Sequence, residues 1–223
     1  MTAAICAFPE DVAPAQALAE ALGLRLHLID IHRFPDGEGL PRAPAGRFDP
    51  LLIYCALDRP DPKLMPLLLL ADAARRAAAG RLILIAPYMP YLRQDAVFRP
   101  GEPVSLQVIG KLLGGAFDTI LTLQPHLHRT HSLAAAFHPA KVDALSAAEL
   151  LAHVIGPDGD PIIVGPDGES APWVRSIAAR LAAPSLVLSK SRSGDRTVEI
   201  ELADAPALAG RRIVLIDDIC STG

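Results

Sequence analysis

The sequence lacks the features of membrane, secreted and nucleic-acid-binding proteins. Hydrophobic residues make up 51% of its 223 residues, yet no run approaches the roughly 18 uninterrupted apolar residues of a membrane-spanning helix. The first residues carry no basic segment ahead of their apolar stretch, so we expect no signal peptide. A formal net charge of -4 gives no general attraction to nucleic acid or to anionic lipid. We therefore expect neither nucleic acid nor a membrane as a partner.

Cysteine is also scarce. Cys6, Cys55 and Cys220 lie far apart in the sequence, in or beside apolar runs, and no CxxC pair is present. A disulfide framework needs several cysteines at short spacings, and a thiolate zinc site needs them in pairs. The cysteine pattern therefore predicts reduced thiols and a cytoplasmic location.

Short apolar runs alternate with helix-like segments along nearly the whole chain. The predicted strands are 3–8, 24–30, 51–57, 81–86, 118–124, 161–165, 185–189, 197–202 and 212–217. The predicted helices are 13–22, 61–79, 103–115, 146–155 and 171–182, the last with Ser170 as its N-cap. Several strands are almost continuously apolar, as in parallel strands covered on both faces. The pattern predicts an α/β fold with mostly parallel sheets, divided into domains at 1–145 and 146–223.

Polar side chains follow several of the predicted strands. His126 follows 118–124, Asp167 follows 161–165, Lys190 follows 185–189 and Asp217 ends 212–217. Ligands of open parallel sheets collect beyond the carboxyl ends of the strands. We therefore expect functional residues at these positions.

The last residues, RRIVLIDDICSTG, join an apolar strand to paired acids and a small polar loop. Asp217 and Asp218 can accept hydrogen bonds from sugar hydroxyls, while the loop's backbone N–H groups can form a nest for phosphate. A strand followed by a capped turn is the alternative, but the whole string favours a sugar-phosphate site. Its predicted loop residues are Ile219, Cys220, Ser221, Thr222 and Gly223.

The terminal string resembles the phosphoribosyl-binding motif of type I phosphoribosyltransferases. Five other strings resemble one family with that fold, ribose-phosphate pyrophosphokinase, in the family's order and spacing. They are RFPDGE (33–38), PYMPYLRQD (87–95), LTLQPHLH (121–128), IIVGPDGES (162–170) and SKSRSGDRTVEI (189–200). The resemblance implies two tandem phosphoribosyltransferase-like three-layer domains, the second incomplete here, and a dimer-based homo-oligomer. Since family members continue past this motif, we expect the natural polypeptide to extend beyond Gly223.

The resemblance also implies an activity: transfer of the diphosphoryl group of ATP to the 1-hydroxyl of ribose 5-phosphate. The products would be AMP and phosphoribosyl pyrophosphate (PRPP). Residues assigned to ATP by the resemblance are Phe34, Asp36, Glu38, Arg93, Gln94 and, nearby, Arg99. The first domain would form the ATP side and the second the ribose-phosphate side.

The resemblance assigns the cofactor Mg²⁺ to a position near His126 and Asp167. Lys190 and Arg192 match a Lys-x-Arg flap that closes over the triphosphate, and His126 joins them as a catalytic residue. Cations that arrive with the substrate would stabilise developing charge and exclude water.

Several alternatives stay open at the level of sequence. RFPDGE is also a strong turn signal, and Asp167 is also suited to capping the next helix. His126 and His128, with His131, could belong to a zinc hydrolase. Three positions depart from the family pattern, and the chain could instead be a nucleobase phosphoribosyltransferase or a non-catalytic regulatory relative. The departures are Gln124, the segment 168–173 and Ser221.

Overall fold

The structure is a computed structural model that describes residues 2–127, 132–192, 198–201, 208 and 210–218; for 189–192 and 198–201 it describes the backbone alone. The chain divides into two compact units, Met1–Leu145 and Ser146–Gly223. Across the described residues, no helix combines the length and the apolar character needed to cross a membrane.

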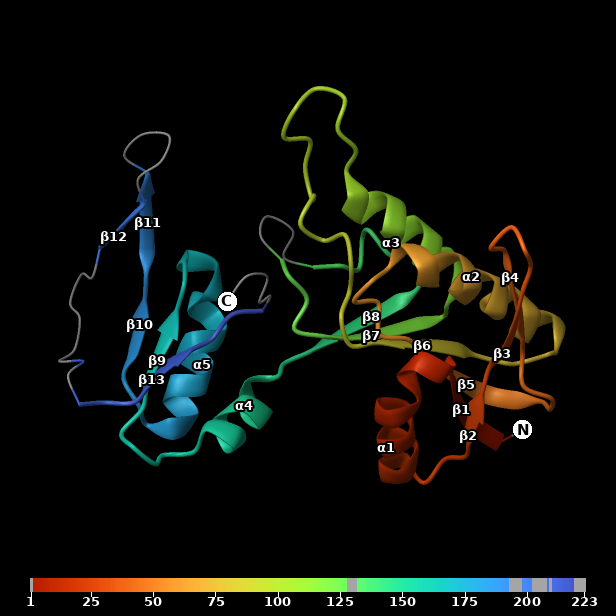
Figure 1. Cartoon of the computed structure of the whole chain (residues 1–223), viewed down its shortest axis with the longest axis horizontal. Helices are drawn as coiled ribbons and strands as arrows, with labels where there is room; N and C mark the ends of the chain where they lie inside the picture. Colours follow the sequence, from red (N-terminus) through yellow and green to blue (C-terminus); the bar gives the residue numbers. More distant parts are fainter. Residues whose placement is uncertain (1, 128–131, 193–197, 202–207, 209, 219–223) are drawn as a thin grey trace. The chain divides into compact units, whose positions relative to one another are not determined.

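The first unit is built on a six-stranded sheet in the order β2-β1-β5-β6-β7-β8 (Figure 1). Every adjacent pair is parallel. The strands are β1 (Thr2–Ala7), β2 (Leu26–Leu28), β5 (Phe48–Tyr54), β6 (Leu82–Ala86), β7 (Thr119–Leu123) and β8 (Lys141–Leu145). Central strands such as Leu51–Tyr54 are buried, which explains their nearly continuous apolar sequence.

Helices cover both faces of this sheet. α1 (Val12–Leu22), entered through the short 3₁₀ turn η1 (Pro9–Asp11), buries Ala15 and Ala19 against one face. α2 (Asp61–Arg76) and α3 (Ser105–Ala116) pack leucine and isoleucine side chains into the larger core on the other face. Figure 1 shows α2 and α3 together on the opposite side of the strands from α1. The first unit is therefore a three-layer α/β/α structure.

The close approach of α3 to the segment that precedes β8 depends on two glycines. A Cβ at Gly110 would lie 2.3 Å from the carbonyl oxygen of Ala136, and a Cβ at Gly114 would lie 2.1 Å from that of Phe137. Phe137 itself is fully buried in the core. The two glycines stand one turn apart on the helix, so together they open the face on which this backbone lies.

An antiparallel hairpin leaves the sheet after β2. It pairs β3 (Asp30–Arg33) with β4 (Gly39–Arg42), and its tip is residues 34–38. Ile31 packs on the main core, so the base of the hairpin is fixed while its tip projects.

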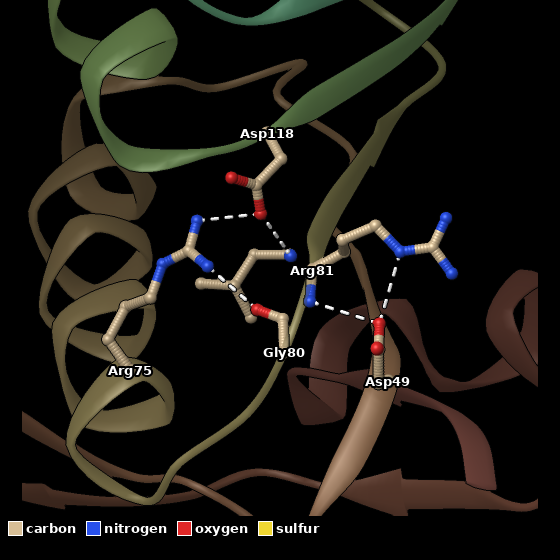
Figure 2. A network of polar contacts seen from close by, with 6 residues as sticks. Asp49, Arg75, Gly80, Arg81 and Asp118 are labelled. Atoms are coloured by element: carbon tan, nitrogen blue, oxygen red, sulfur yellow. Dashed lines mark hydrogen bonds and ion pairs between the residues drawn. The ribbon is translucent and has the colours of Figure 1, made fainter. Parts of the chain in front are cut away.

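Acid–base contacts connect the amino ends of three strands (Figure 2). Asp118, just before β7, accepts hydrogen bonds of 2.7 Å from the guanidinium of Arg75 on α2 and from the backbone N–H of Leu82. Arg75 also donates to the carbonyl oxygen of Gly80, and Asp49 on β5 accepts from Arg81. These hydrogen bonds lower the pKa of Asp49. The network lies at the edge opposite the carboxyl ends of the strands, so its role is structural.

The second unit has a smaller parallel sheet in the order β10-β9-β13. Its elements are α4 (Ala148–Ile155), β9 (Ile162–Gly165), the 3₁₀ turn η2 (Gly168–Ser170), α5 (Ala171–Leu181), β10 (Ser185–Val187) and β13 (Ile213–Leu215), with an antiparallel pair β11 (Ser189–Arg192) and β12 (Val198–Glu201). α4 and α5 pack on one face of the sheet, around the buried side chains of Ile163, Val174 and Ile177.

The prediction of an α/β fold with mostly parallel sheets is confirmed, and every predicted strand and helix overlaps an observed one. Some details were wrong. The predicted strand 24–30 is divided between β2 and the hairpin strand β3, and the predicted strand 185–189 is divided between β10 and the start of β11. The strands β4 and β8 were missed. Ser170 does occupy the N-cap position of α5, but its hydroxyl donates to the carbonyl oxygen of Asp167 and caps no helical N–H.

Gly114→Ala should lower the free energy of unfolding by about 1–3 kcal/mol, because the new methyl group collides with the backbone at Phe137. Gly115→Ala is the matched control: its Cβ would meet nothing within 4 Å. Alanine there should stabilise the helix by about 0.5–1 kcal/mol. Urea unfolding measures the change in the free energy of unfolding, which should be negative for Gly114→Ala and positive for Gly115→Ala. Equal changes would contradict the close packing of α3 on Phe137.

Candidate functional site

In the first unit, the carboxyl ends of β1, β5, β6 and β7 meet at one edge of the sheet. The residues that follow these strands include Asp11, the segment 56–58, the loop 87–104 and the segment 124–127. The backbone keeps them together beyond the strands, since Leu123 N–H donates to Pro87 O at 3.1 Å and Cys55 N–H to Ile85 O at 3.0 Å. We call this the carboxyl edge of the first unit.

The loop after β6 presents Arg93 and Gln94 at this edge. Leu92 is buried in the main core and anchors the loop, whereas the side chain of Arg93 is exposed and Gln94 is half-buried. The Gln94 side chain accepts a hydrogen bond of 2.9 Å from the hydroxyl of Ser105. Arg99 lies farther along the same loop, where its backbone N–H donates to the carboxylate of Glu102 at 3.1 Å.

His126 follows β7 at the same edge. Gln124 adopts a left-handed conformation with φ 43°, and its N–H donates to the carbonyl oxygen of Leu145 at 2.8 Å, so the β7–β8 ladder ends there. His126 is half-buried just beyond this turn. On β7 the Thr122 hydroxyl is buried without a hydrogen-bond partner among the described residues. A buried polar group of this kind costs stability, and such groups are uncommon in folded proteins.

Phe34, Asp36 and Glu38 lie at the exposed tip of the β3–β4 hairpin. Phe34 N–H donates to Glu38 O at 2.9 Å, and the Asp36 carboxylate accepts from Glu38 N–H at 3.1 Å. The turn expected from Asp-Gly is therefore present. Phe34 is 41% exposed and its ring stands edge-on to that of His32, which leaves an aromatic side chain and two carboxylates on the surface of the hairpin.

Sequence reasoning missed a buried acid–base pair at the carboxyl edge. Asp11, only 5% exposed, accepts from the backbone N–H of Ala56 at 3.0 Å. Lys63 on α2 lies 3.9 Å from the Asp11 carboxylate, bonds the Ala56 carbonyl oxygen and pairs with Asp58 at 2.6 Å. Burial raises the pKa of Asp11, against the opposing effect of Lys63. The available signal was an acid soon after the first strand, the same pattern that drew attention to Asp167.

In the second unit, Asp167 follows β9 and caps the turn that leads into α5. Its carboxylate accepts from the backbone N–H groups of Glu169 and Ser170, both at 3.2 Å. The turn packs closely on the strand, because a Cβ at Gly165 would lie 2.1 Å from the Ser170 hydroxyl oxygen. Asp167 therefore caps the turn, as the alternative from the sequence predicted, and these hydrogen bonds hold it at the carboxyl end of β9.

Asp217 and Asp218 follow β13, the parallel neighbour of β9. Asp218 N–H donates to the Asp217 carboxylate at 2.9 Å. Burial raises the pKa of Asp217, and the negative charges of Asp218 and Asp167 raise it further, although the Asp218 N–H opposes them. The acids after two adjacent strands thus influence one another electrostatically, as expected for parallel strands that end at one edge.

Six of the predicted site residues fall into two groups, while Phe34, Asp36 and Glu38 lie at the tip of the β3–β4 hairpin. Arg93, Gln94 and His126 belong to the carboxyl edge of the first unit, and Asp167, Asp217 and Asp218 to that of the second. Lys190 and Arg192 lie on β11, where the backbone alone is described. Ile219, Cys220, Ser221, Thr222 and Gly223 lie outside the described residues, as do His128 and His131.

A metal site built wholly from protein ligands is not found in the part of the chain that is described: no group of three or more His, Cys, Asp or Glu side chains there could hold an ion. Mg²⁺ commonly takes one or two carboxylates together with water and substrate phosphates. Burial raises the pKa of Asp217 and the charges of Asp218 and Asp167 raise it further, and a bound cation would offset both effects. The residues after β9 and β13 therefore fit magnesium.

Comparison with known families gives two matches that together cover most of the chain. Residues 4–116 match the N-terminal domain of ribose phosphate pyrophosphokinase, and residues 138–223 match the phosphoribosyl transferase domain.

Individual proteins agree with the family matches. The chain is 33% identical to the ribose-phosphate pyrophosphokinase of Methanopyrus kandleri, over 98% of this chain and 75% of that protein. It is 33% identical to that of Saccharolobus solfataricus, over 93% and 72%. The crystal structure of phosphoribosylpyrophosphate synthetase from Mycobacterium smegmatis superimposes with a TM-score of 0.76 at 25% identity, over 98% of this chain and 72% of that one.

Asp217→Asn should raise the melting temperature of the ligand-free protein at pH 7.5, by about 1–2 °C. The raised pKa means that ionised Asp217 is less favourable in the folded than in the unfolded chain. That cost is fully present above the folded-state pKa and disappears as the pH falls through the ordinary carboxyl range, near about pH 4. The gain should therefore shrink between pH 7.5 and pH 4.5 in thermal melts.

Asp160→Asn is the control for this experiment. It removes an equal charge from the same unit, but Asp160 has a cationic partner, Arg211, at 2.7 Å. Its replacement should not raise the melting temperature. A lower melting temperature for Asp217→Asn than for the parent at pH 7.5 would refute the repulsion inferred at this edge.

Proposed function

The chain belongs to the ribose-phosphate pyrophosphokinase family of transferases, and we propose that it converts ATP and ribose 5-phosphate into AMP and PRPP. The 1-hydroxyl oxygen of the sugar attacks the β-phosphorus of ATP and the hydroxyl proton is lost. The bond from the β-phosphorus to the oxygen that bridges it to the α-phosphorus breaks, and AMP leaves. The observation that carries the proposal is the match of 98% of the chain to a relative of that name, with both family domains in the same order.

We further propose that the carboxyl edge of the first unit binds ATP. Arg93 offers a planar guanidinium for phosphate or for stacking on adenine, and Gln94 offers an amide. The exposed hairpin tip with Phe34, Asp36 and Glu38 suits an adenine ring, which stacks on an aromatic face and whose amino group donates to carboxylates. Arg99 and His126 supply further groups for the polyphosphate.

The second unit would bind ribose 5-phosphate. Asp217 and Asp218 accept from the sugar hydroxyls, and the loop 219–223 receives the 5-phosphate in its backbone N–H groups. In the second unit Asp167 would hold Mg²⁺, which would supply positive charge for the polyphosphate. Lys190 and Arg192 would stabilise the charge that develops on the transferring group.

A reducing cytosol and a dimer-based homo-oligomer belong to the same proposal. Cys6 and Cys55 are free and buried, and burial raises the pKa of each thiol to about 12. Thiols that ionise so little react slowly, which supports their reduced state.

A nucleobase phosphoribosyltransferase is disfavoured, because residues 4–116 match the N-terminal domain of ribose phosphate pyrophosphokinase.

One assay tests the proposed activity. The purified chain is incubated with ATP, Mg²⁺ and ribose 5-phosphate, and nucleotides and PRPP are separated by anion exchange. AMP and PRPP should form in equal amounts and only when the sugar is present. ADP as the nucleotide product would contradict diphosphoryl transfer, and ATP binding without any product would favour a non-catalytic relative.

Lys190→Ala should lower kcat by about 100-fold or more while leaving the Kd for ATP within about threefold, because a flap cation acts mainly in the transition state. Lys141→Ala is a charge-matched control, since Lys141 is exposed on β8 and pairs with its neighbour Asp143. Stopped-time assays give kcat, and calorimetry gives the Kd. Equal losses in rate and in ATP affinity would remove Lys190 from the transition state.

A further inference from the structure

Gln94 is held by the first turn of α3 at two points. The hydroxyl of Ser105 donates to the Gln94 side-chain oxygen Oε1 at 2.9 Å. The next residue, Leu106, donates its backbone N–H to the carbonyl oxygen of Gln94 at 3.3 Å. One helical turn therefore restrains both the main chain and the side chain of a residue eleven positions earlier in the sequence.

The Ser105 hydroxyl has no capping role in its own helix. A serine at a helix start usually accepts from one of the first helical N–H groups. Here the N-cap position belongs to Val104, and the start of α3 has no side-chain capping hydrogen bond. The hydroxyl is used instead for a tertiary contact with the loop after β6. Its effect therefore falls on Gln94.

That contact gives the Gln94 amide a direction. A carboxamide has an acceptor oxygen at one end and two N–H donors at the other. Because the hydroxyl donates to Oε1, the amide oxygen is engaged and the Nε2 donors are the end left for a ligand. ATP is rich in acceptors, its phosphate oxygens and ring nitrogens above all. The protein must therefore offer hydrogen-bond donors to bind ATP.

The other end of the same loop is also fixed. The hydroxyl of Tyr91, a residue with φ 62°, donates to the carboxylate of Asp61 at the start of α2. Leu92 is 2% exposed in the main core. Arg93 and Gln94 thus stand between an anchor on α2 and an anchor on α3, which reduces the ordering that a ligand must impose.

We propose that Ser105 is a positioning residue for the nucleotide: it orients the Gln94 amide so that its N–H groups face the acceptor atoms of ATP. The inference rests on the proposed function, in which Gln94 contacts ATP. Without the hydroxyl, Leu106 still holds the Gln94 main chain, but the amide can rotate. Such a loss weakens ground state and transition state alike, so it should raise KM with little change in kcat.

Calorimetric titration with ATP and Mg²⁺ and steady-state kinetics test this on the full chain. Ser105→Ala should raise both the Kd and the KM for ATP by about threefold to tenfold, the usual worth of one hydrogen bond, with kcat within about twofold. Ser105→Thr keeps the hydroxyl and should restore parental values. Ser176→Ala is the matched control: its hydroxyl contacts Arg180 on α5 at 2.7 Å, and its loss should leave the Kd unchanged.

A double-mutant cycle tests whether Ser105 acts through Gln94. In a Gln94→Ala background, Ser105→Ala should produce no further loss of ATP affinity. If the alanine variant does not fold, Ser105→Cys, which keeps the volume but donates poorly, takes its place. An unchanged Kd in Ser105→Ala, a Ser105→Thr variant as weak as alanine, or additive losses in the cycle would each overturn the proposal.

The outcomes separate this inference from the proposed activity. PRPP synthesis with an unchanged Kd for ATP in Ser105→Ala overturns the role of Ser105 alone. ATP binding that weakens as expected, without PRPP synthesis by the parent, overturns the activity alone and supports the positioning role. Failure of the parent to bind ATP at all would overturn both.

Discussion

Parallel strand pairing is the constraint on which the rest of this structure depends. In the first unit it aligns β1, β5, β6 and β7 so that the residues after each strand arrive at one edge. In the second unit it aligns β9 with β13, so that Asp167 and the pair Asp217–Asp218 arrive together. Many of the candidate site residues thus lie at the carboxyl edges. The amino edge of the first unit carries the Asp49, Arg81 and Asp118 contacts that join the starts of β5, β6 and β7 (Figure 2).

The two edges differ in how their polar groups are satisfied. At the first, polar side chains have hydrogen-bond or charged partners. Asp11 accepts from Ala56 N–H and lies beside Lys63, and Gln94 accepts from the Ser105 hydroxyl. At the second, burial raises the pKa of Asp217, and the negative charges of Asp218 and Asp167 raise it further. A site for a sugar and a divalent cation requires several carboxylates close together, and their charges are unfavourable while no ligand is bound. Ionised carboxylates accept from hydroxyls and bind the cation better than neutral groups do. Stability is thus reduced at the place where binding is proposed.

The sequence predicted the fold well where a single local rule decides. Continuous apolar runs such as LLIY gave β5, and the spacing of apolar residues gave α3. The prediction failed where one apolar run, 24–30, pairs first with β1 and then with β4. Ile29 still bonds β1 through the carbonyl oxygen of Ala7, but Asp30 already pairs with Arg42 in the hairpin. The edge strand β8 was missed because its KVDAL sequence is largely exposed.

Candidate site residues could be proposed from position after a strand and from family motifs, whereas the contacts that hold them could not. Ser105 and Gln94, or Asp11 and Ala56, are joined only by the folded chain. Asp167 differs from these pairs. The acid proposed to bind the ligand also caps a turn, and the sequence supported both roles.

The central claim, that ATP binds at the carboxyl edge of the first unit and ribose 5-phosphate at that of the second, can be tested directly by hydrogen–deuterium exchange with each ligand alone. ATP with Mg²⁺ should slow amide exchange in the loop 87–104 and at the start of α3. Ribose 5-phosphate should slow exchange after β13, in residues 217–223. Protection of the first unit's loop by ribose 5-phosphate, or protection confined to the amino edge around Arg81 and Asp118, would contradict the account.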